Sequence, residues 1–319
     1  MARIVESFEN TPSEMLRGIA IMVLAAGVIP LLDVCGKMLV TDHDISPGEV
    51  ALSRQFLQTV MILPVILATE GVVGLRTTRP GLNMLRGLLL SVAAVAFFGA
   101  LRFMPLADAV AVFMVEPLIV TVLSAVFLKE TIGFRRIAAV CVGFVGAIII
   151  IRPSYAVFGA ASLLPLFTAL LVAAYFILSR KVSRGTSPSA MMVHAGAAGT
   201  VALVIAMAIG HPLGMEELRF TWPDSGATWV LILLAGGIGT LGHLFFVMAY
   251  RLAPASVLAP FGYLEIVSAI GFGYLFFGDL PDMLKFVGIA IIVGSGLFVY
   301  LRERRARLSL DRATVAPPN

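Results

Sequence analysis

The sequence has 319 residues, of which 59% are hydrophobic and 13% charged, with a formal net charge of +4. Its mean hydropathy is +0.99. A chain with so few polar residues cannot cover a water-soluble globule of this length, so a soluble fold is excluded and lipid is the expected solvent. The positive net charge therefore does not indicate nucleic-acid binding, and its distribution along the chain carries the information.

Apolar segments of membrane-spanning length follow one another along almost the whole chain. Each is long enough to cross about 30 Å of hydrocarbon as a helix rising about 1.5 Å per residue. Because backbone polar groups in lipid must be satisfied within a helix, we predict an all-α integral membrane fold with ten transmembrane helices. The predicted spans are 16–40, 48–69, 81–101, 106–128, 134–151, 157–179, 189–210, 227–250, 255–277 and 283–301.

Basic residues predict the orientation of these spans. If the N-terminus is cytoplasmic, most of the 23 Lys and Arg residues fall on the inner side, including the five arginines between 302 and 312. The positive-inside rule then predicts that both termini are cytoplasmic. The long connection around 214–225 is expected to hold an interfacial element, with Trp222 and Trp229 at the headgroup level.

The stretch from Ala100 to Pro153 returns, without a gap, from Ala249 to Arg302. Glu116 matches Glu265 at the same depth of an apolar span. The basic turn after the first copy of this span becomes acidic in the second copy, as expected if the two halves insert with opposite orientation. The repeat predicts two inverted halves of five helices each.

The two copies also resemble the drug/metabolite transporter superfamily, specifically its EamA-type members. The residues that carry the resemblance are LRFMPLADAVAVFMVEPLIVTVLSAVFLKETIGFRRIAAVCVGFVGAIIIIRP and YRLAPASVLAPFGYLEIVSAIGFGYLFFGDLP. The resemblance implies two inverted five-helix repeats around a central cavity that opens alternately to each side. It gives a cytoplasmic segment at 1–15, EamA repeats at 16–151 and 152–301, and a basic cytoplasmic tail at 302–319.

The implied function is secondary transport of a small organic metabolite across the bacterial inner membrane. The stretches TRPGLNMLRGLLL and PFGYLEIVSA resemble uptake carriers for riboflavin or S-adenosylmethionine. Export of amino acids or drugs is the alternative. A membrane enzyme is less favoured because the acidic residues are scattered and central, and a channel is less favoured because no selectivity ring is evident.

Charged residues within the spans are the candidate site, because a charge in the membrane centre is costly and usually faces a cavity or a partner. Glu116 and Glu265 lie near the middle of their spans, close to Pro117 and Pro260, which we expect to kink the helices. We interpret the two carboxylates as lining the substrate path from opposite halves, with one binding protons. The alternative is that neighbouring helices hold each one in a structural contact.

The first two spans supply three more charges. Asp33 and Lys37 are four residues apart, so they share a helical face and are predicted to pair. Arg54 either binds a substrate carboxylate or phosphate or neutralises Asp33 or Glu116. These groups leave one negative charge in excess, which favours a neutral or cationic substrate, or a proton.

Five other polar and aromatic residues are interpreted as follows. Tyr263 is singled out as a path residue because it lies beside Glu265. Asp108 and Arg86 are interpreted first as anchors that reach the membrane interface and second as site residues. His194 and His243 are interpreted as hydrogen-bonded core residues rather than metal ligands or a relay.

The sequence gives no sign of a resident cofactor or metal, and no ATPase motif, so transport is predicted to use a substrate gradient, a proton gradient or exchange. The expected partners are the small-molecule substrate and the lipid bilayer. A homodimer is left open, and no nucleic-acid partner is expected.

Overall fold

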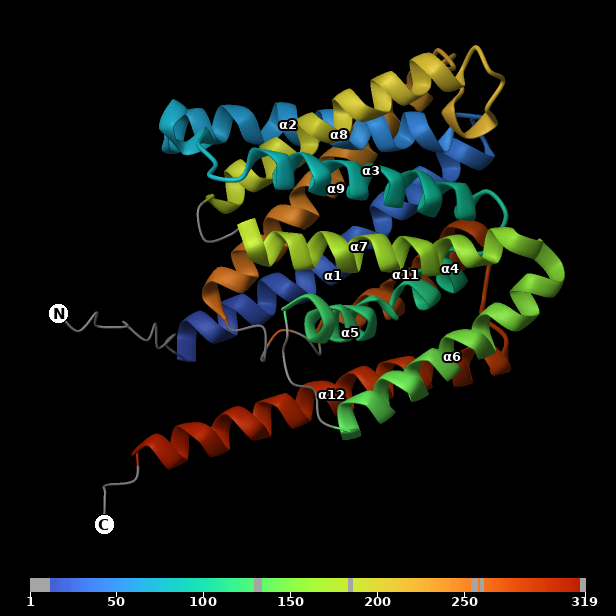
Figure 1. Ribbon diagram of the computed structural model, residues 1–319. Coiled ribbons are helices and arrows are strands. Elements are labelled where there is room, and N and C mark those ends of the chain that lie inside the picture. Colours follow the sequence, from blue (N-terminus) through green and yellow to red (C-terminus); the bar gives the residue numbers. More distant parts are fainter. Residues whose placement is uncertain (1–11, 129–133, 183–185, 254–257, 259–260, 316–319) are drawn as a thin grey trace.

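The computed structural model describes residues 12–128, 134–182, 186–253, 258 and 261–315, and these residues form helices without any strand (Figure 1). The prediction of an all-α fold is therefore confirmed. The α-helices are α1 (Pro12–Thr41), α2 (Pro47–Thr69), α3 (Pro80–Leu101), α4 (Leu106–Phe113), α5 (Glu116–Leu128), α6 (Phe134–Phe158), α7 (Leu164–Val182), α8 (Pro188–Gly210), α9 (Gly226–Leu252), α11 (Leu264–Phe277) and α12 (Met283–Val315). Short 3-10 turns occur at Val72–Leu75, Gly159–Leu163 and Glu216–Leu218.

Seven of the described helical segments are long and apolar enough to cross a membrane. Three shorter apolar helices, Ile137–Arg152, Leu264–Phe277 and Met283–Phe298, lie within or close to the bounds of three further predicted spans. The chain is therefore a multi-pass membrane protein. The total of ten spans stays a prediction.

Two helices in the two halves of the chain begin with the same signal. Ser46 and Ser187 precede Pro47 and Pro188, the first residues of α2 and α8. Each serine hydroxyl accepts a hydrogen bond from a backbone N–H in the first turn of its helix. Serine satisfies an otherwise unpaired donor, and proline loses nothing at the first helical position because its N–H is not needed there.

The span that contains Glu116 is interrupted. Helix α4 ends at Phe113, the chain turns at Met114 and Val115, and α5 begins at Glu116. The second half has a similar interruption, where Tyr263 forms a turn immediately before α11. Two helix breaks therefore fall at matching positions of the sequence repeat, each directly before or within two residues of a carboxylate.

The helices pack in pairs that join distant parts of the chain. Helix α1 lies against α9 and α11, α3 lies against α7 and α8, and α12 runs beside α6 (Figure 1). The α6–α12 contact requires glycine, since a Cβ atom at Gly146 would lie 2.9 Å from the carbonyl oxygen of Gly288. Small residues at this crossing let the two backbones approach closely.

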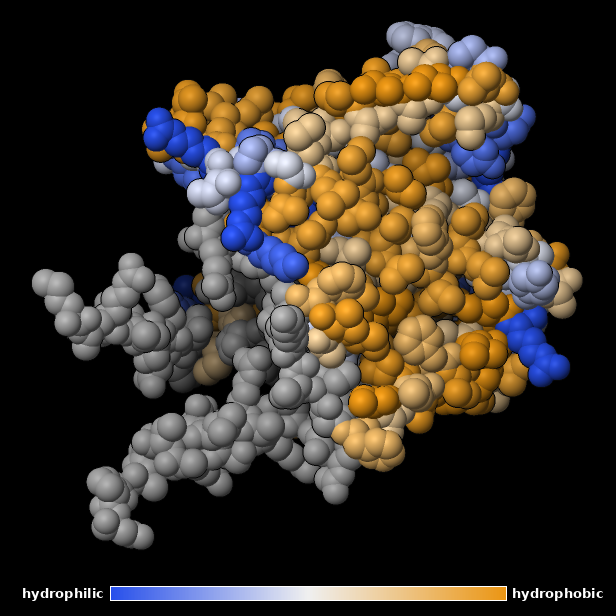
Figure 2. Space-filling view, viewed as in Figure 1, coloured by the Kyte–Doolittle hydropathy of each residue, from blue (hydrophilic) through white to orange (hydrophobic). Residues whose placement is uncertain are grey.

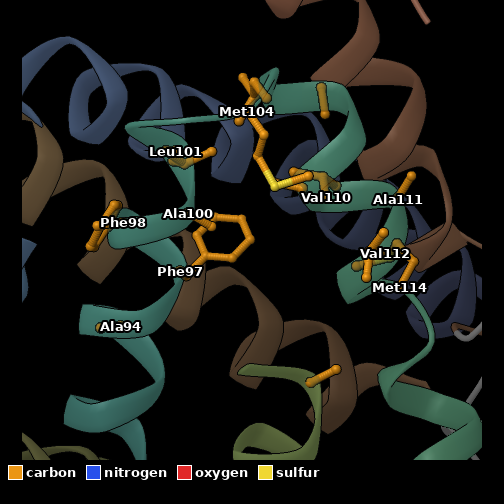
Figure 3. Close-up of a cluster of buried hydrophobic side chains, with 14 of the residues drawn as sticks. Ala94, Phe97, Phe98, Ala100, Leu101, Met104, Val110, Ala111, Val112 and Met114 are labelled. Atoms are coloured by element: carbon orange, nitrogen blue, oxygen red, sulfur yellow. The ribbon is translucent and has the colours of Figure 1, made fainter. Parts of the chain in front are cut away.

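The main core surrounds the link between α3 and α4. Phe97, Phe98 and Leu101 are buried in α3, and Met104 extends from the link toward Val110 of α4 (Figure 3). The visible outer surface is mostly apolar, with hydrophilic residues gathered toward the helix ends (Figure 2). An apolar surface around the helices, with polar ends, is what a protein surrounded by lipid requires.

Candidate substrate path

The two central carboxylates stand at the beginnings of helices. Glu116 is the first residue of α5 and Glu265 the second residue of α11. The first N–H groups of a helix have no partner within the helix, and the helix dipole favours negative charge there. The breaks thus provide a favourable setting for a carboxylate that would otherwise be costly within the membrane.

Pro117 lies in the first turn of α5 rather than within a continuous helix. At this position, the missing N–H of proline breaks no intrahelical hydrogen bond. The expected kink is therefore a full interruption of the span at Met114 and Val115. Pro260, the corresponding call in the second half, lies outside the described residues.

Arg54 of α2 and His243 of α9 face one another. The Nη2 group of Arg54 lies 3.5 Å from Nε2 of His243, and Nδ1 of His243 lies 3.2 Å from Oε1 of Gln58. Gln58 in turn donates from Nε2 to the carbonyl oxygen of Met192, at 3.1 Å. The Nε atom of Arg54 is buried and has no hydrogen-bond partner among the described residues.

Five of the predicted path residues form one electrostatic group. The charges of Asp33 and Arg54 act on one another, and Glu265 is within range of both Asp33 and Glu116. Tyr263 is within range of Glu116. Helices from both halves of the chain therefore contribute to one polar cluster, which we call the central cluster: Asp33, Arg54, Glu116, Tyr263 and Glu265. Asp33 and Glu265 are buried, and the other three are partly buried.

Lys37 does not belong to the central cluster. Its Nζ atom lies 3.0 Å from Asp279, 3.4 Å from the carbonyl oxygen of Met104, and 4.5 Å from the ring centroid of Phe277. The predicted pairing of Lys37 with Asp33 is therefore wrong. The two residues share a helical face, but the long lysine side chain reaches along α1 to an acidic partner in the link between α11 and α12.

A second ion pair also joins the two halves of the chain. Lys285 of α12 donates to Asp108 of α4 at 2.6 Å, and Asp282 lies 3.9 Å away. Asp108 is only 1% exposed. The expectation that Asp108 is an interfacial anchor is wrong, because the folded chain supplies a basic partner inside the protein.

Arg86 is buried as well, so its interpretation as an interfacial anchor is also wrong. Its guanidinium donates to Ser179 at 2.8 Å, to Asn83 at 2.7 Å and to the Tyr175 hydroxyl at 3.0 Å. It also lies 4.6 Å from the Tyr175 ring centroid. Arg86 therefore ties α3 to α7 through neutral partners.

Tyr263 packs onto α12 through a glycine. A Cβ atom at Gly296 would overlap the Tyr263 hydroxyl oxygen, and this buried oxygen has no hydrogen-bond partner among the described residues. Glycine at 296 is thus required for the present position of the tyrosine ring. The ring places its hydroxyl in the vicinity of Glu116.

The structure gives no reason to assign a metal to this site. Within the described ranges, no group of three or more His, Cys, Asp or Glu residues is arranged to hold an ion. His194 bonds the carbonyl oxygen of Leu75 at 2.7 Å, far along the chain from His243. A hollow of about 310 Å³ lies elsewhere, among Leu52, Val204, Met207, Ala208, His211, Pro212 and Phe220. It contains none of the predicted path residues.

Known proteins resemble the chain along most of its length. A riboflavin transporter of Vibrio cholerae is 32% identical, over 78% of this chain and 81% of its own. An S-adenosylmethionine uptake transporter of Rickettsia prowazekii is 28% identical, over 92% of this chain and 96% of its own.

A solved structure titled "Crystal structure of protein" has a TM-score of 0.63 and 19% identity, and it covers 91% of this chain and 99% of that one. At this identity, the likeness shows the fold alone. The family model described as "EamA-like transporter family" matches twice, at residues 16–152 and 159–301. With most of its length matched in this way, the chain belongs to the EamA-like transporter family.

Proposed function

We propose that this protein is a secondary transporter that takes up a riboflavin-like heterocyclic metabolite across the bacterial inner membrane. The observation that carries the proposal is the central cluster, which joins Asp33, Arg54 and Glu116 of the first matched segment electrostatically to Tyr263 and Glu265 of the second. Intramembrane ionisable residues at such a meeting point usually mark a substrate or ion path.

The proposed architecture is two inverted repeats of five spans, 16–151 and 152–301, with both termini in the cytoplasm. Three observations support it. The family model matches two successive segments, the same Ser-Pro signal opens α2 and α8, and helix breaks precede Glu116 and Glu265 at equivalent points. The distribution of Lys and Arg supports cytoplasmic termini.

Alternating access follows from this arrangement. Each repeat supplies an interrupted helix with a carboxylate at the break, and rocking of one repeat against the other would expose the cluster to either side in turn. The chain does not carry an ATPase motif, so the driving force is a substrate or proton gradient, or exchange. Glu116 and Glu265 are the proposed proton-binding groups.

The charge of the central cluster limits the classes of substrate that it can bind. The central cluster holds three carboxyl side chains and one guanidinium, so a free phosphate or carboxylate on the substrate would meet more repelling groups than attracting ones. A neutral heterocycle with carbonyl and ring-nitrogen acceptors suits Arg54 and the Tyr263 ring better. The name of the Vibrio cholerae relative supports riboflavin as the first substrate to test.

S-adenosylmethionine is the second candidate. The Rickettsia prowazekii relative carries that name, and the excess of acidic groups in the cluster suits a sulfonium cation. Export of amino acids or drugs is a further alternative, because the same cavity serves either direction of transport.

The test is uptake into proteoliposomes of labelled riboflavin, riboflavin 5′-phosphate and S-adenosylmethionine. We expect saturable riboflavin uptake, with much weaker uptake of the phosphate ester. Saturable uptake of S-adenosylmethionine alone would replace riboflavin by the second candidate. If vesicles preloaded with each compound exchange none of the three, the proposed substrate class is wrong.

A separate experiment tests the direction of riboflavin transport. Expression of the protein in a riboflavin auxotroph should permit growth on low riboflavin if the protein takes riboflavin up, and should not do so if the protein exports it.

A further inference from the structure

A chain of hydrogen bonds from α8 leads to the guanidinium of Arg54. It begins at the Met192 carbonyl oxygen, which accepts from Nε2 of Gln58 at 3.1 Å. A backbone carbonyl can only accept, so this contact places the amide nitrogen of Gln58 toward α8 and its Oε1 toward α9. Gln58 is 2% exposed.

The orientation of Gln58 then fixes the tautomer of His243. Its Oε1 atom can only accept, so the His243 nitrogen 3.2 Å away must be Nδ1–H. A neutral imidazole protonated on Nδ1 carries a lone pair on Nε2. That lone pair faces Nη2 of Arg54 at 3.5 Å. Arg54 can only donate, so every contact in the chain has one donor and one acceptor.

One N–H group of the Arg54 guanidinium has no hydrogen-bond partner among the described residues. His243 is the one hydrogen-bond partner of Arg54 among these residues, and the buried Nε–H has no acceptor. An unpartnered N–H of a buried cation is costly, and a carbonyl or ring nitrogen of a bound molecule would satisfy it. His243 meanwhile restrains the guanidinium through its other edge.

We propose that His243 is a positioning residue, which holds Arg54 so that its Nε–H is presented to an acceptor atom of the transported molecule. This inference rests on the proposed function for the role of Arg54. The proposal also assigns a role to Gln58 and Met192, which would hold His243 in place without contacting the substrate.

The alternative is that His243 only fills space between α2 and α9. The two accounts differ in what they predict when Arg54 is changed. If His243 acts through Arg54, its removal has no further effect on binding once Arg54 has lost its donors. If His243 is only a packing residue, the two changes act independently.

The test is a double-mutant cycle on riboflavin binding, with His243→Leu, Arg54→Met and both together in detergent-purified protein. We expect His243→Leu to raise Kd about tenfold or more, which is the usual effect of losing a hydrogen bond to a charged group. His243→Gln, which offers an acceptor oxygen, should recover part of the affinity. The effect should be absent in the Arg54→Met background. An equal loss in that background would overturn the proposal, as would an unchanged Kd for His243→Leu.

Two matched controls are present in the chain. Gln55→Leu changes a buried glutamine in the same helix that bonds Ser91 rather than His243. His194→Leu changes a histidine that bonds the Leu75 backbone. Both controls should leave Kd close to wild type, whereas Gln58→Leu should follow His243→Leu.

A second measurement tests the proposal without any substrate. In protein labelled with ¹⁵N-histidine, the resonances lost in His243→Gln identify His243 among the four histidines. We expect a protonated Nδ1 and an unprotonated Nε2, and a shift of both in Gln58→Leu but not in Gln55→Leu. The opposite tautomer would overturn the proposal even if riboflavin is not the substrate. Failure of wild type to bind riboflavin, with the expected tautomer present, would count against the proposed function alone.

Discussion

Lys285 and Asp108 form an ion pair of 2.6 Å between α12 and α4, and thereby join the two segments that the family model matches. The Asp108 carboxylate is almost completely buried, so its charge depends on this single basic partner. Removal of one member of a buried pair costs about 3–5 kcal/mol, because the other charge is left uncompensated.

We therefore expect Lys285→Met to lower the thermal stability of the purified protein severely, and Lys285→Met combined with Asp108→Asn to recover much of the loss. The measurement is the unfolding midpoint in detergent. Arg102→Met is the matched control, since Arg102 pairs with the exposed Asp44 at 3.2 Å and such surface pairs contribute about 0–1 kcal/mol. Equal destabilisation by the two single variants would contradict this account.

The Lys37 contact with Asp279 is a second link between the matched segments. Both ion pairs lie at the end of the helices that the charge distribution predicts to face outward. Under the proposed alternating access, opening of that end would require both pairs to break. We expect Lys37→Met with Asp279→Asn to shift the population toward the outward-open state. The measurement is labelling, by a membrane-impermeant thiol reagent, of a cysteine placed at the buried position of Met104.

The background for that experiment replaces Cys35 and Cys141, which are both free thiols. Faster labelling than in the parent with intact ion pairs is the expected result. An unchanged labelling rate would mean that these pairs do not hold the outer end closed.

Glu116→Gln and Glu265→Gln test the roles of the two carboxylates. The change conserves shape and removes the charge, so we expect the protein to fold and insert normally while proton-coupled riboflavin uptake falls at least tenfold in one of the two variants. Exchange of internal for external substrate needs no net proton movement and should be less affected. Wild-type uptake by both variants would assign the carboxylates to structure.

The contact of Tyr263 with Gly296 predicts a rescue. Gly296→Ala places a methyl group on the Tyr263 hydroxyl, so the ring must move and transport should fall. Tyr263→Phe removes the nearest colliding atom but leaves the ring carbon Cζ in overlap with the new methyl group, so the double variant should recover only part of the stability lost in Gly296→Ala. Tyr263→Phe alone should cost little stability, because the hydroxyl has no hydrogen-bond partner among the described residues. No recovery in the double variant would show that the glycine is needed for another contact.

Asp44, in the link between α1 and α2, gives a prediction of pH dependence. A hydrogen bond from Arg219 lowers the pKa of this carboxyl below its ordinary value of 3.8. A carboxyl with a depressed pKa in the folded state stabilises the fold above its unfolded pKa, and this contribution is lost as pH falls through the folded pKa.

The stability difference between wild type and Asp44→Asn should therefore be present at neutral pH and should shrink at pH values below the ordinary Asp pKa. Because Asp44 is largely exposed, the difference should be small and should weaken with salt. A difference that grows on acidification would contradict the assignment.

The sequence alone determined that this protein is surrounded by lipid, that its fold is all-α and that its sequence contains an internal repeat. A high content of apolar residues leaves lipid as the only suitable surroundings, and lipid permits only structures that satisfy their own backbone. The rare charges at Glu116 and Glu265 were visible for the same reason, since an intramembrane carboxylate stands out against apolar neighbours.

The tertiary structure decided the partners of those charges. Helical periodicity placed Lys37 beside Asp33, yet its partner is Asp279, and the buried positions of Arg86 and Asp108 were not evident from their places near span ends. Periodicity reports which face of one helix a side chain occupies, whereas a salt bridge depends on how far its long side chain extends and on which other helix lies there. The chain of hydrogen bonds from Met192 to Arg54 was not predictable from the sequence for the same reason, because it joins three helices that are far apart in the sequence.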